Sequence, residues 1–312
     1  MRQLKTFLVV NPSSANGATG RRFPEILAEV RRAIGEVAHA FTDGPMQATH
    51  LTRKALEEGY ELVVAVGGDG TVNEVVNGFL EDGKPLRAEA MLGIVPRGTG
   101  GAFRRVFGWS TRLDEAAARL RGEAWTPVDV GRIEFAGHDG ARRARYFVNV
   151  ASAGVSGLVD WEVNRASKLL GGKASFVLGT LRAMHKYRDR RLRVAFDDEP
   201  ARELDATVLA VANGQFFGGG MWIAPDARHD DGVFDVTLWS GYQLRDFVLK
   251  GRAIYSGRHV DFPNTKRFRA RRLRIEADEP VLIDVDGEQP GLLPVTIEIL
   301  PGLLRLKVAP AD

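Results

Sequence analysis

A glycine-rich turn between an apolar strand and a helix is the feature that most constrains the fold. Residues 62–66 (LVVAV) form a short apolar run that is rich in β-branched side chains, which is typical of a buried parallel strand. Three of the next four residues are glycine, in the run Gly67–Thr71 (GGDGT). Glycines let backbone N–H groups approach an anion closely, and a helix N-terminus adds partial positive charge. The run therefore predicts a phosphate-binding turn, with Asp69 at the sheet edge where open α/β folds bind ligands.

Two more loops of small residues follow apolar strands. The sequence NPSSANG, residues 11–17, follows the strand predicted at 6–10, and PRGTGGA, residues 96–102, follows the strand predicted at 92–95. Carboxyl ends of parallel strands meet at one sheet edge, so three such loops predict a nucleotide-binding site better than three unrelated turns. Neither the Walker A pattern nor the dinucleotide pattern GxGxxG is present.

The order of elements predicts two domains. A chain of 312 residues exceeds the usual size of one compact core. We expect an α/β nucleotide-binding domain with a parallel sheet at 1–128, with helices at 23–34, 47–58 and 113–120. A β-rich domain, sandwich-like and interrupted by a helix at 166–186, is expected at 129–312, and its last strands could also pack on the first domain. Its strands are expected at 146–150, 192–196, 206–211, 233–238, 282–285, 295–300 and 303–308.

Composition excludes several classes of function. No apolar run approaches the roughly 18 residues that span a bilayer. The absence of cysteine excludes disulfides and thiolate metal sites, and is consistent with a cytoplasmic location. A net charge of +3 is too mild to indicate nucleic-acid binding. Basic residues nevertheless cluster at 142–145, 186–193 and 266–274, where they could attract anionic lipid headgroups or form solvated strand faces.

In this order and spacing, NPSSANG, GGDGT with Asn73-Glu74, and PRGTGGAF resemble the nucleotide-binding domain of the diacylglycerol kinase catalytic family. That family includes bacterial soluble lipid kinases and the sphingosine and ceramide kinases. GGDGT alone is less specific, because NAD kinases also carry it. The resemblance continues through the second half of the chain, in residues 147–151, 212–213, 218–220, 225–227, 231–232 and 286–288.

The resemblance implies a set of site residues in a cleft between the two domains. ATP would lie over Asn11, Thr42, Gly67, Gly68, Gly70, Thr71, Glu74 and Thr99. Asp69 would organise the phosphate-bound Mg²⁺, Asp286 would be the general base, and Glu288 would contact the nucleotide or the metal. A second, structural Mg²⁺ would be held by Asp231 and the Val233 carbonyl, since hard oxygen ligands suit this ion.

One departure from the family pattern keeps alternatives open. Bacterial members commonly read GTxNDF in the second glycine loop, whereas this chain has Gly101 and Ala102. The expected function is an ATP-dependent lipid kinase, acting on diacylglycerol or a sphingoid or ceramide-type lipid at the inner membrane face. A non-catalytic lipid- or nucleotide-binding relative, or an NAD-kinase-like enzyme, is the alternative. No nucleic-acid partner and no transmembrane segment are expected, and a homodimer stays open.

Overall fold

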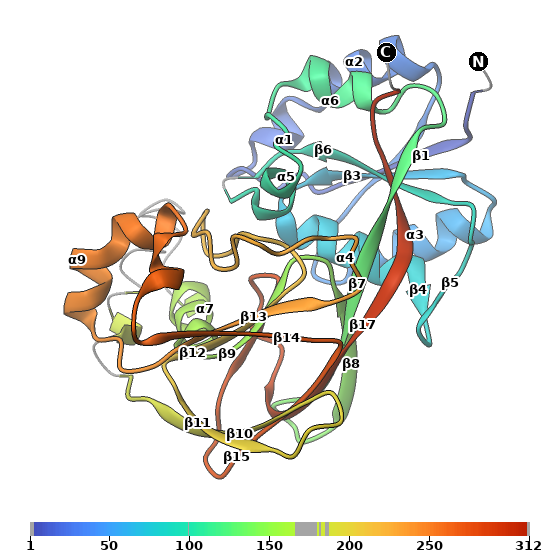
Figure 1. Ribbon diagram of the computed structural model, residues 1–312. Helices are drawn as coiled ribbons and strands as arrows, with labels where there is room; N and C mark the ends of the chain where they lie inside the picture. The colour runs from blue at the N-terminus through green and yellow to red at the C-terminus, as the bar shows by residue number, and fades with distance from the viewer. Residues whose placement is uncertain (1–2, 99, 166–179, 181, 185–186, 311–312) are drawn as a thin grey trace. The chain divides into compact units, whose positions relative to one another are not determined.

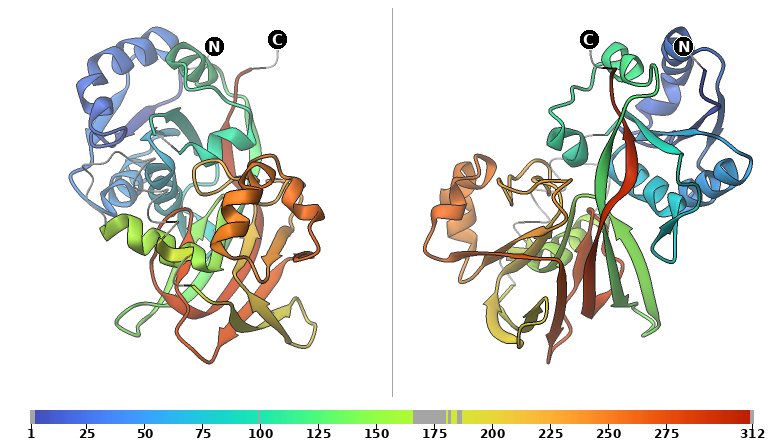
Figure 2. Two further views of the ribbon diagram at one scale, coloured as in Figure 1. Left: turned by 90° about the vertical axis from the view of Figure 1, so that its left-hand side faces the viewer. Right: turned by 45° about the vertical axis from the view of Figure 1, so that its right-hand side comes forward.

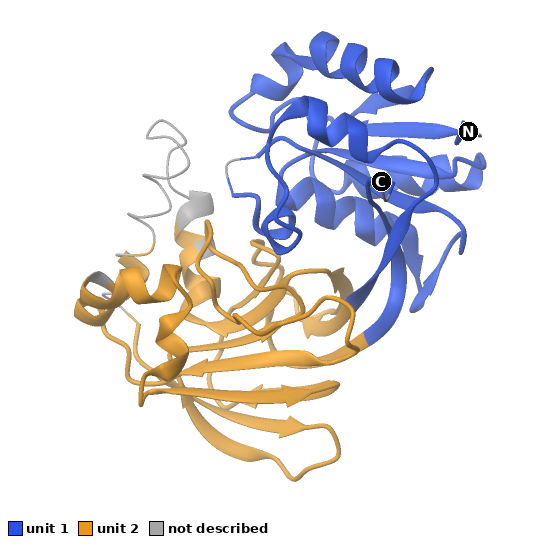
Figure 3. Cartoon of the chain, turned by 45° about the horizontal axis from the view of Figure 1, so that its top comes forward, with its two compact units in different colours: residues 1–130, 300–312 blue, residues 131–299 orange. Residues whose placement is uncertain are grey.

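The computed structural model describes residues 3–98, 100–165, 180, 182–184 and 187–310. The chain divides into two compact units, shown in Figure 3. Unit 1 comprises residues 1–130 and 300–312, and unit 2 comprises residues 131–299. Most of the helix expected at 166–186 lies outside the described residues. In the part of the chain that is described, no helix is long and apolar enough to cross a bilayer.

Unit 1 is built on a parallel sheet. Its strand order is β2-β1-β3-β6, formed by β2 (Ala38–Phe41), β1 (Thr6–Val10), β3 (Leu62–Gly67) and β6 (Met91–Pro96). The last part of β17 (Leu292–Lys307) adds a further parallel strand, where Arg305 and Leu306 pair with Met91 and Leu92. All six residues of β3 are buried, as expected for a central strand with both faces covered.

Helices cover both faces of this sheet (Figure 1). One face packs on α2 (Phe23–Ile34) and α6 (Leu113–Arg119), around Leu8, Ile26 and Leu120. On the other face lie α3 (Gln47–Glu57) and α4 (Asp69–Phe79). Short elements complete the unit: α1 (Ala18–Arg21), β4 (Leu80–Glu81), β5 (Lys84–Pro85) and α5 (Ala102–Val106).

Unit 2 is a sandwich of two antiparallel sheets around one apolar core. One sheet is formed by β7 (Trp125–Ala136), β8 (Arg142–Phe147), β10 (Arg190–Phe196), β11 (Arg202–Ala206), β15 (Arg272–Ala277) and the first part of β17. The other, in the order β14-β13-β12-β9-β16, is formed by β14 (Thr265–Ala270), β13 (Phe234–Trp239), β12 (Val208–Ala212), β9 (Val150–Gly154) and β16 (Ile283–Val285).

The second face of the five-stranded sheet is also covered. A separate apolar cluster there joins β12 to α7 (Val155–Arg165), to α9 (Leu244–Tyr255) and to the loop after β12. The 3-10 helix η2 (Arg258–Asp261) follows α9. Because both faces are covered, every residue of β12 is buried.

The expected fold class is confirmed, although β2, β7, β14 and β15 have no counterpart among the expected strands and some expected strands are divided differently. The single strand expected at 146–150 is instead the end of β8 and the start of β9, separated at Val148 and Asn149. The two strands expected at 295–300 and 303–308 form one continuous strand, β17, which runs through Pro301-Gly302. The first part of β17 belongs to unit 2 and its last part to unit 1.

Candidate active site

The loops that follow the parallel strands of unit 1 are tied together by backbone hydrogen bonds. The Asn11 N–H donates to the Val66 carbonyl at 3.0 Å, and the Thr42 N–H donates to the Val10 carbonyl at 2.8 Å. The Arg97 N–H donates to the Gly67 carbonyl at 2.6 Å. The ends of β1, β2, β3 and β6 are thereby held at one edge of the sheet, where the sequence predicted the nucleotide loops.

Asp69 lies where two of these loops meet. One carboxylate oxygen accepts the N–H of Ala102 at 3.1 Å and the other accepts the N–H of Phe103 at 3.2 Å. Asp69 therefore begins α4 while its side chain caps the N-terminus of α5. A carboxylate offers about four acceptor positions, so two N–H bonds leave positions for Mg²⁺. The side chain present at this position fits the predicted metal.

The backbones of the two glycine loops lie too close together for a side chain to fit between them. A Cβ built on Gly98 would lie 2.6 Å from the Gly68 Cα, which is closer than real side chains come. A Cβ on Gly67 would lie 2.3 Å from the Thr71 hydroxyl oxygen. Only glycine fits at these positions, so the glycines are required for the close approach of the loops.

The first loop is joined to the second through side chains. The Asn11 amide nitrogen donates to the Thr71 hydroxyl at 3.1 Å, and the Asn11 amide oxygen accepts the Ser13 N–H at 3.0 Å. Thr71 is buried in the first turn of α4, one residue after Gly70. The predicted nucleotide residues Asn11 and Thr71 are thus brought together, whereas Thr99 lies outside the described residues.

Glu74 connects two helices. Its carboxylate accepts the Ala48 N–H at 3.0 Å, near the N-terminus of α3, and its carbonyl accepts the Thr49 hydroxyl at 2.8 Å. An acidic group at a helix N-terminus satisfies an N–H that has no partner within the helix. Glu74 therefore helps to hold α3 against α4, and its contact with a nucleotide stays a prediction.

Arg97 is a cation that the sequence analysis did not single out. In the described part of the chain its buried Nε and Nη2 atoms have no hydrogen-bond partner. Burial lowers the pKa of Arg97, and the neighbouring Arg22 guanidinium lowers it further. An under-compensated cation directly after β6 suits an anionic ligand at this edge. The signal in the sequence was its position between the strand and Gly98.

In unit 2, Asp286 is fixed by three backbone donors. Its carboxylate accepts the N–H groups of Val148 at 3.1 Å, Asn149 at 3.1 Å and Val150 at 2.9 Å. Its own N–H donates to the Val150 carbonyl at 2.9 Å. Asp286 has a φ of 51°, a left-handed conformation that aspartate adopts more readily than most residues, and Gly287 follows at 88°. The predicted base is therefore held in a tight turn against the β8–β9 break.

Two buried asparagines hold that break in place. The Asn213 amide nitrogen donates to the Val148 carbonyl at 2.9 Å, and the Asn213 N–H donates to the Asn149 carbonyl at 2.9 Å. The Asn149 amide nitrogen donates to the Phe216 carbonyl. The sequence analysis gave neither asparagine a role, although a polar residue that ends an apolar strand was a usable signal.

Glu288 and Asp284 flank the predicted base. Glu288 forms an ion pair with Arg145 at 2.7 Å, so a metal or nucleotide at Glu288 would share the carboxylate with a guanidinium. The buried Asp284 carboxylate accepts the Gly287 N–H at 2.8 Å and the Ser152 hydroxyl at 3.2 Å. Asp284 thus shapes the turn that carries Asp286.

Comparison with known families accounts for both units. Residues 5–133 match the diacylglycerol kinase catalytic domain, and residues 149–308 match the YegS C-terminal NAD kinase beta sandwich-like domain. The chain belongs to the diacylglycerol kinase catalytic family. The resemblance inferred from the loop motifs is thereby confirmed.

Curated relatives in this family match almost the whole chain. A diacylglycerol kinase of Bacillus subtilis (strain 168) is 26% identical over 290 residues, which cover 92% of this chain and 90% of the relative. A diacylglycerol kinase of Mycobacterium tuberculosis (strain ATCC 25618 / H37Rv) is 27% identical over 303 residues, which cover 97% and 94%.

Solved structures show the same fold. A Bacillus anthracis str. Sterne protein classed with the diacylglycerol kinases superposes with a TM-score of 0.77 at 26% identity, covering 99% of each chain. An NAD kinase from Archaeoglobus fulgidus reaches a TM-score of 0.52 at 12% identity, covering 97% of this chain and 94% of that one. The NAD kinase shares the fold alone.

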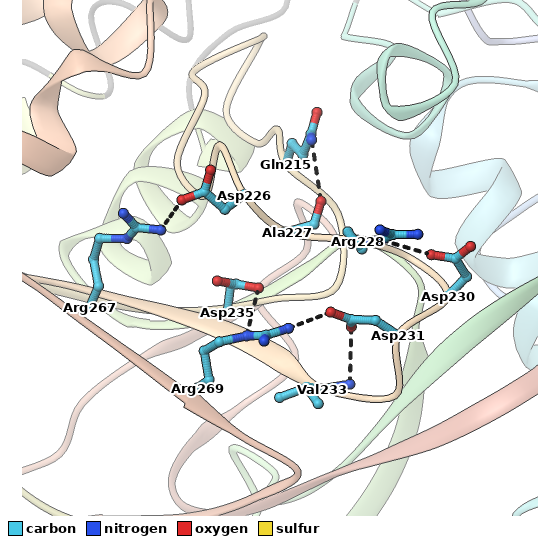
Figure 4. Close-up of polar contacts among 10 residues, drawn as sticks. All are labelled: Gln215, Asp226, Ala227, Arg228, Asp230, Asp231, Val233, Asp235, Arg267 and Arg269. Atoms are coloured by element: carbon cyan, nitrogen blue, oxygen red, sulfur yellow. Dashed lines mark hydrogen bonds and ion pairs between the residues drawn. The ribbon is translucent and has the colours of Figure 1, made fainter.

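The residues predicted for the family's second magnesium site already pair with an arginine (Figure 4). One Asp231 carboxylate oxygen accepts the Val233 N–H at 3.3 Å, and the other forms an ion pair with Arg269. Arg269 also lies 3.6 Å from the carboxylate of Asp235, whose pKa is raised by burial. Within the described residues, no three acidic or histidine side chains converge on a point that could hold a metal. An ion at Asp231 would therefore share the carboxylate with the Arg269 guanidinium or displace it.

Proposed function

We propose that this protein is an ATP- and Mg²⁺-dependent lipid kinase that transfers the γ-phosphate to the hydroxyl of diacylglycerol, or of a sphingoid or ceramide-type lipid. We further propose that it acts from the cytoplasm on the inner membrane face. The observation that carries the proposal is the position of Asp69, whose carboxylate is bound by the first N–H groups of α5 between two glycine loops. Membership of the diacylglycerol kinase catalytic family supports the lipid acceptor.

Unit 1 would bind the nucleotide. Backbone N–H groups of the loops at Gly68 and Gly98 suit phosphate oxygens, and the Arg97 guanidinium adds positive charge. Asp69 would hold Mg²⁺, which when bound neutralises charge on the phosphate oxygens. Asn11 and Thr71 would fix the loops around them.

Asp286 of unit 2 would take the proton from the acceptor hydroxyl. In this step a bond forms between the hydroxyl oxygen and the γ-phosphorus, and the bond to the oxygen bridging the β- and γ-phosphates breaks, releasing ADP. The proton passes to the Asp286 carboxylate. Three N–H donors fix the orientation of that carboxylate, which supports its assignment as the base because phosphoryl transfer depends on positioned groups.

Replacement of the base tests this assignment. Asp286→Asn keeps the shape of the side chain but cannot accept the proton, so we expect kcat to fall by roughly 10²–10⁴-fold. The measurement is phosphate transfer from labelled ATP to detergent-dispersed diacylglycerol, with Asp278→Asn, an exposed aspartate of the same unit, as the matched control. Full activity of Asp286→Asn would exclude it as the base. Phosphorylation of NAD without any lipid would instead favour the NAD-kinase-like alternative.

The contact between Ala102 and Asp69 supports a second candidate function, which is binding of a nucleotide or lipid without catalysis. The N–H of Ala102 binds Asp69, so a side chain at 102 starts beside the predicted metal ligand, where the family pattern GTxNDF implies an aspartate. This alternative predicts ATP binding without turnover on any lipid, and a gain of activity in Ala102→Asp. Turnover by the unaltered protein contradicts it.

A further inference from the structure

Most arginines in the basic clusters on the strands of unit 2 form ion pairs with acidic partners. Arg143 pairs with Asp139 at 2.7 Å, and Arg193 pairs with Asp278 at 2.6 Å. The same holds for the pairs Arg142–Glu134, Arg145–Glu288, Arg190–Glu279, Arg267–Asp226 and Arg269–Asp231. The clusters at 142–145 and 186–193 therefore offer little uncompensated charge to an anionic surface, which favours solvated strand faces there. Within the described residues, Lys266, Arg271 and Arg272 have no ion-pair partner, so both interpretations stay open for the cluster at 266–274.

Helix α9 differs from the strands because an exposed leucine lies between its arginines. Arg245, Leu249 and Arg252 are spaced by four and three residues, so they lie on one face of the helix. The opposite face carries Phe247 and Ile254, which pack in the apolar cluster beneath the five-stranded sheet. Figures 1 and 2 show α9, in orange, on the outer side of unit 2.

The outer face of α9 carries arginines without ion-pair partners in the described residues, and apolar side chains that are exposed. Within the described residues, no acidic group lies at ion-pair distance from Arg245, Arg252 or Arg258, the first residue of η2. Between them, Leu249 is 81% exposed, the highest value among the large apolar side chains described, and Tyr255 is 51% exposed. We call these five residues the α9 surface. The neighbouring acids are Asp246, which pairs with Lys250 at 2.9 Å, and the exposed Asp261.

We propose that the α9 surface docks on a membrane that contains anionic lipids. This inference rests on the proposed function, in which the acceptor lipid lies in a membrane. Arginines are attracted to an anionic leaflet, and Leu249 and Tyr255 can enter the boundary between headgroups and acyl chains. A second copy of the chain is a less suitable partner for this surface. A symmetric contact would place Arg245 and Arg252 of one copy against the arginines of the other, and these like charges would repel.

Vesicle binding tests the surface directly. The intact protein is sedimented with phosphatidylcholine vesicles that contain or lack phosphatidylglycerol, without ATP. We expect binding only to the anionic vesicles, about fivefold weaker for each of Arg245→Gln and Arg252→Gln, and about tenfold weaker for Leu249→Ser. The matched controls remove an exposed, ion-paired arginine in Arg274→Gln and an exposed leucine in Leu86→Ser, and both should bind normally.

An activity assay separates this proposal from the proposed function. The α9 variants should phosphorylate a short-chain, water-soluble diacylglycerol at the normal rate but a long-chain diacylglycerol in anionic vesicles more slowly. If the unaltered protein phosphorylates neither lipid, the lipid-kinase proposal fails, and the vesicle assay still decides the surface. Equal binding by unaltered protein and Leu249→Ser, or no binding to anionic vesicles, would overturn the α9 surface. If light scattering showed that the unaltered protein is a dimer and that Leu249→Ser is not, the α9 surface would be assigned to self-association instead.

Discussion

Arg269 decides what the carboxylates around it can bind. Its guanidinium pairs with Asp231 and lies 3.6 Å from Asp235, in the place where the family resemblance implied a divalent cation. A buried carboxylate is costly unless it is paired, and either a guanidinium or a metal ion can supply the positive charge. Arginine and Mg²⁺ therefore compete for Asp231. Removal of the arginine should increase the stabilisation that Mg²⁺ provides.

Arg269→Gln tests this competition. The variant leaves Asp231 and the buried Asp235 without their cation, so we expect it to be about 1–3 kcal/mol less stable in the presence of EDTA. Millimolar Mg²⁺ should raise the unfolding temperature of the variant by more than it raises that of the unaltered protein. The measurement is thermal unfolding by circular dichroism without nucleotide, and Arg274→Gln is the control. An equal response of both proteins to Mg²⁺ would contradict the competition.

At the scale of elements, β17 depends on a buried lysine at its end. Lys307 is 1% exposed, and its ammonium donates to the carbonyls of Arg121 at 2.7 Å, Ala124 at 3.0 Å and Val308 at 2.8 Å. These bonds fasten the last residues of the strand to the segment between α6 and β7. Burial lowers the pKa of Lys307 to about 8.

This lowered pKa predicts a pH dependence of stability. The folded state releases the proton near pH 8, whereas the unfolded chain keeps it to about 10.5. Between these values the unfolded state binds more protons, so the Lys307 contribution to the free energy of unfolding rises with pH, by at most about 1.4 kcal/mol per unit. Urea unfolding of the unaltered protein and of Lys307→Met checks this. The free energy of unfolding of the unaltered protein minus that of the variant should be constant well below pH 8 and become more positive above it. A constant value of this difference up to pH 10.5 would refute the prediction.

At the scale of the whole molecule, two strands link the units. Both β7 and β17 begin in one unit and end in the other, so each unit depends on residues far away in the sequence. Unit 1 in particular includes the buried Leu304 and Leu306 from the end of the chain. Unfolding of one unit should therefore disturb the strands of the other.

Nucleotide binding should stabilise the intact chain through unit 1. With Mg-ATP at 100 times its dissociation constant, the stabilisation is about 2.7 kcal/mol, which corresponds to an increase of roughly 5–10 °C in unfolding temperature. Hydrogen exchange should slow at residues 11–17, 67–71 and 97–101, where the N–H groups would bind phosphate. Asp69→Asn should weaken both effects, and NAD should produce neither. Protection confined to unit 2 would be incompatible with the proposed site.

The sequence alone predicted the nucleotide edge because that signal is local. Strands β1 and β3, helix α2 and the glycine loops are specified by consecutive residues, since a buried strand followed by a glycine turn has few other solutions. The close approach of Gly68 and Gly98 follows from strands that are neighbours in the sheet. The family motif extended this inference to Asp69.

Only the tertiary structure decided how acidic side chains are paired. The N–H donors to Asp286 lie more than 130 positions earlier in the chain, at the break between β8 and β9, and Arg269 reaches Asp231 from a neighbouring strand. Strand registers bring these residues together, and registers depend on packing between distant segments rather than on local preference. The sequence therefore determined which residues can carry the chemistry, and the tertiary structure determined which partners hold them.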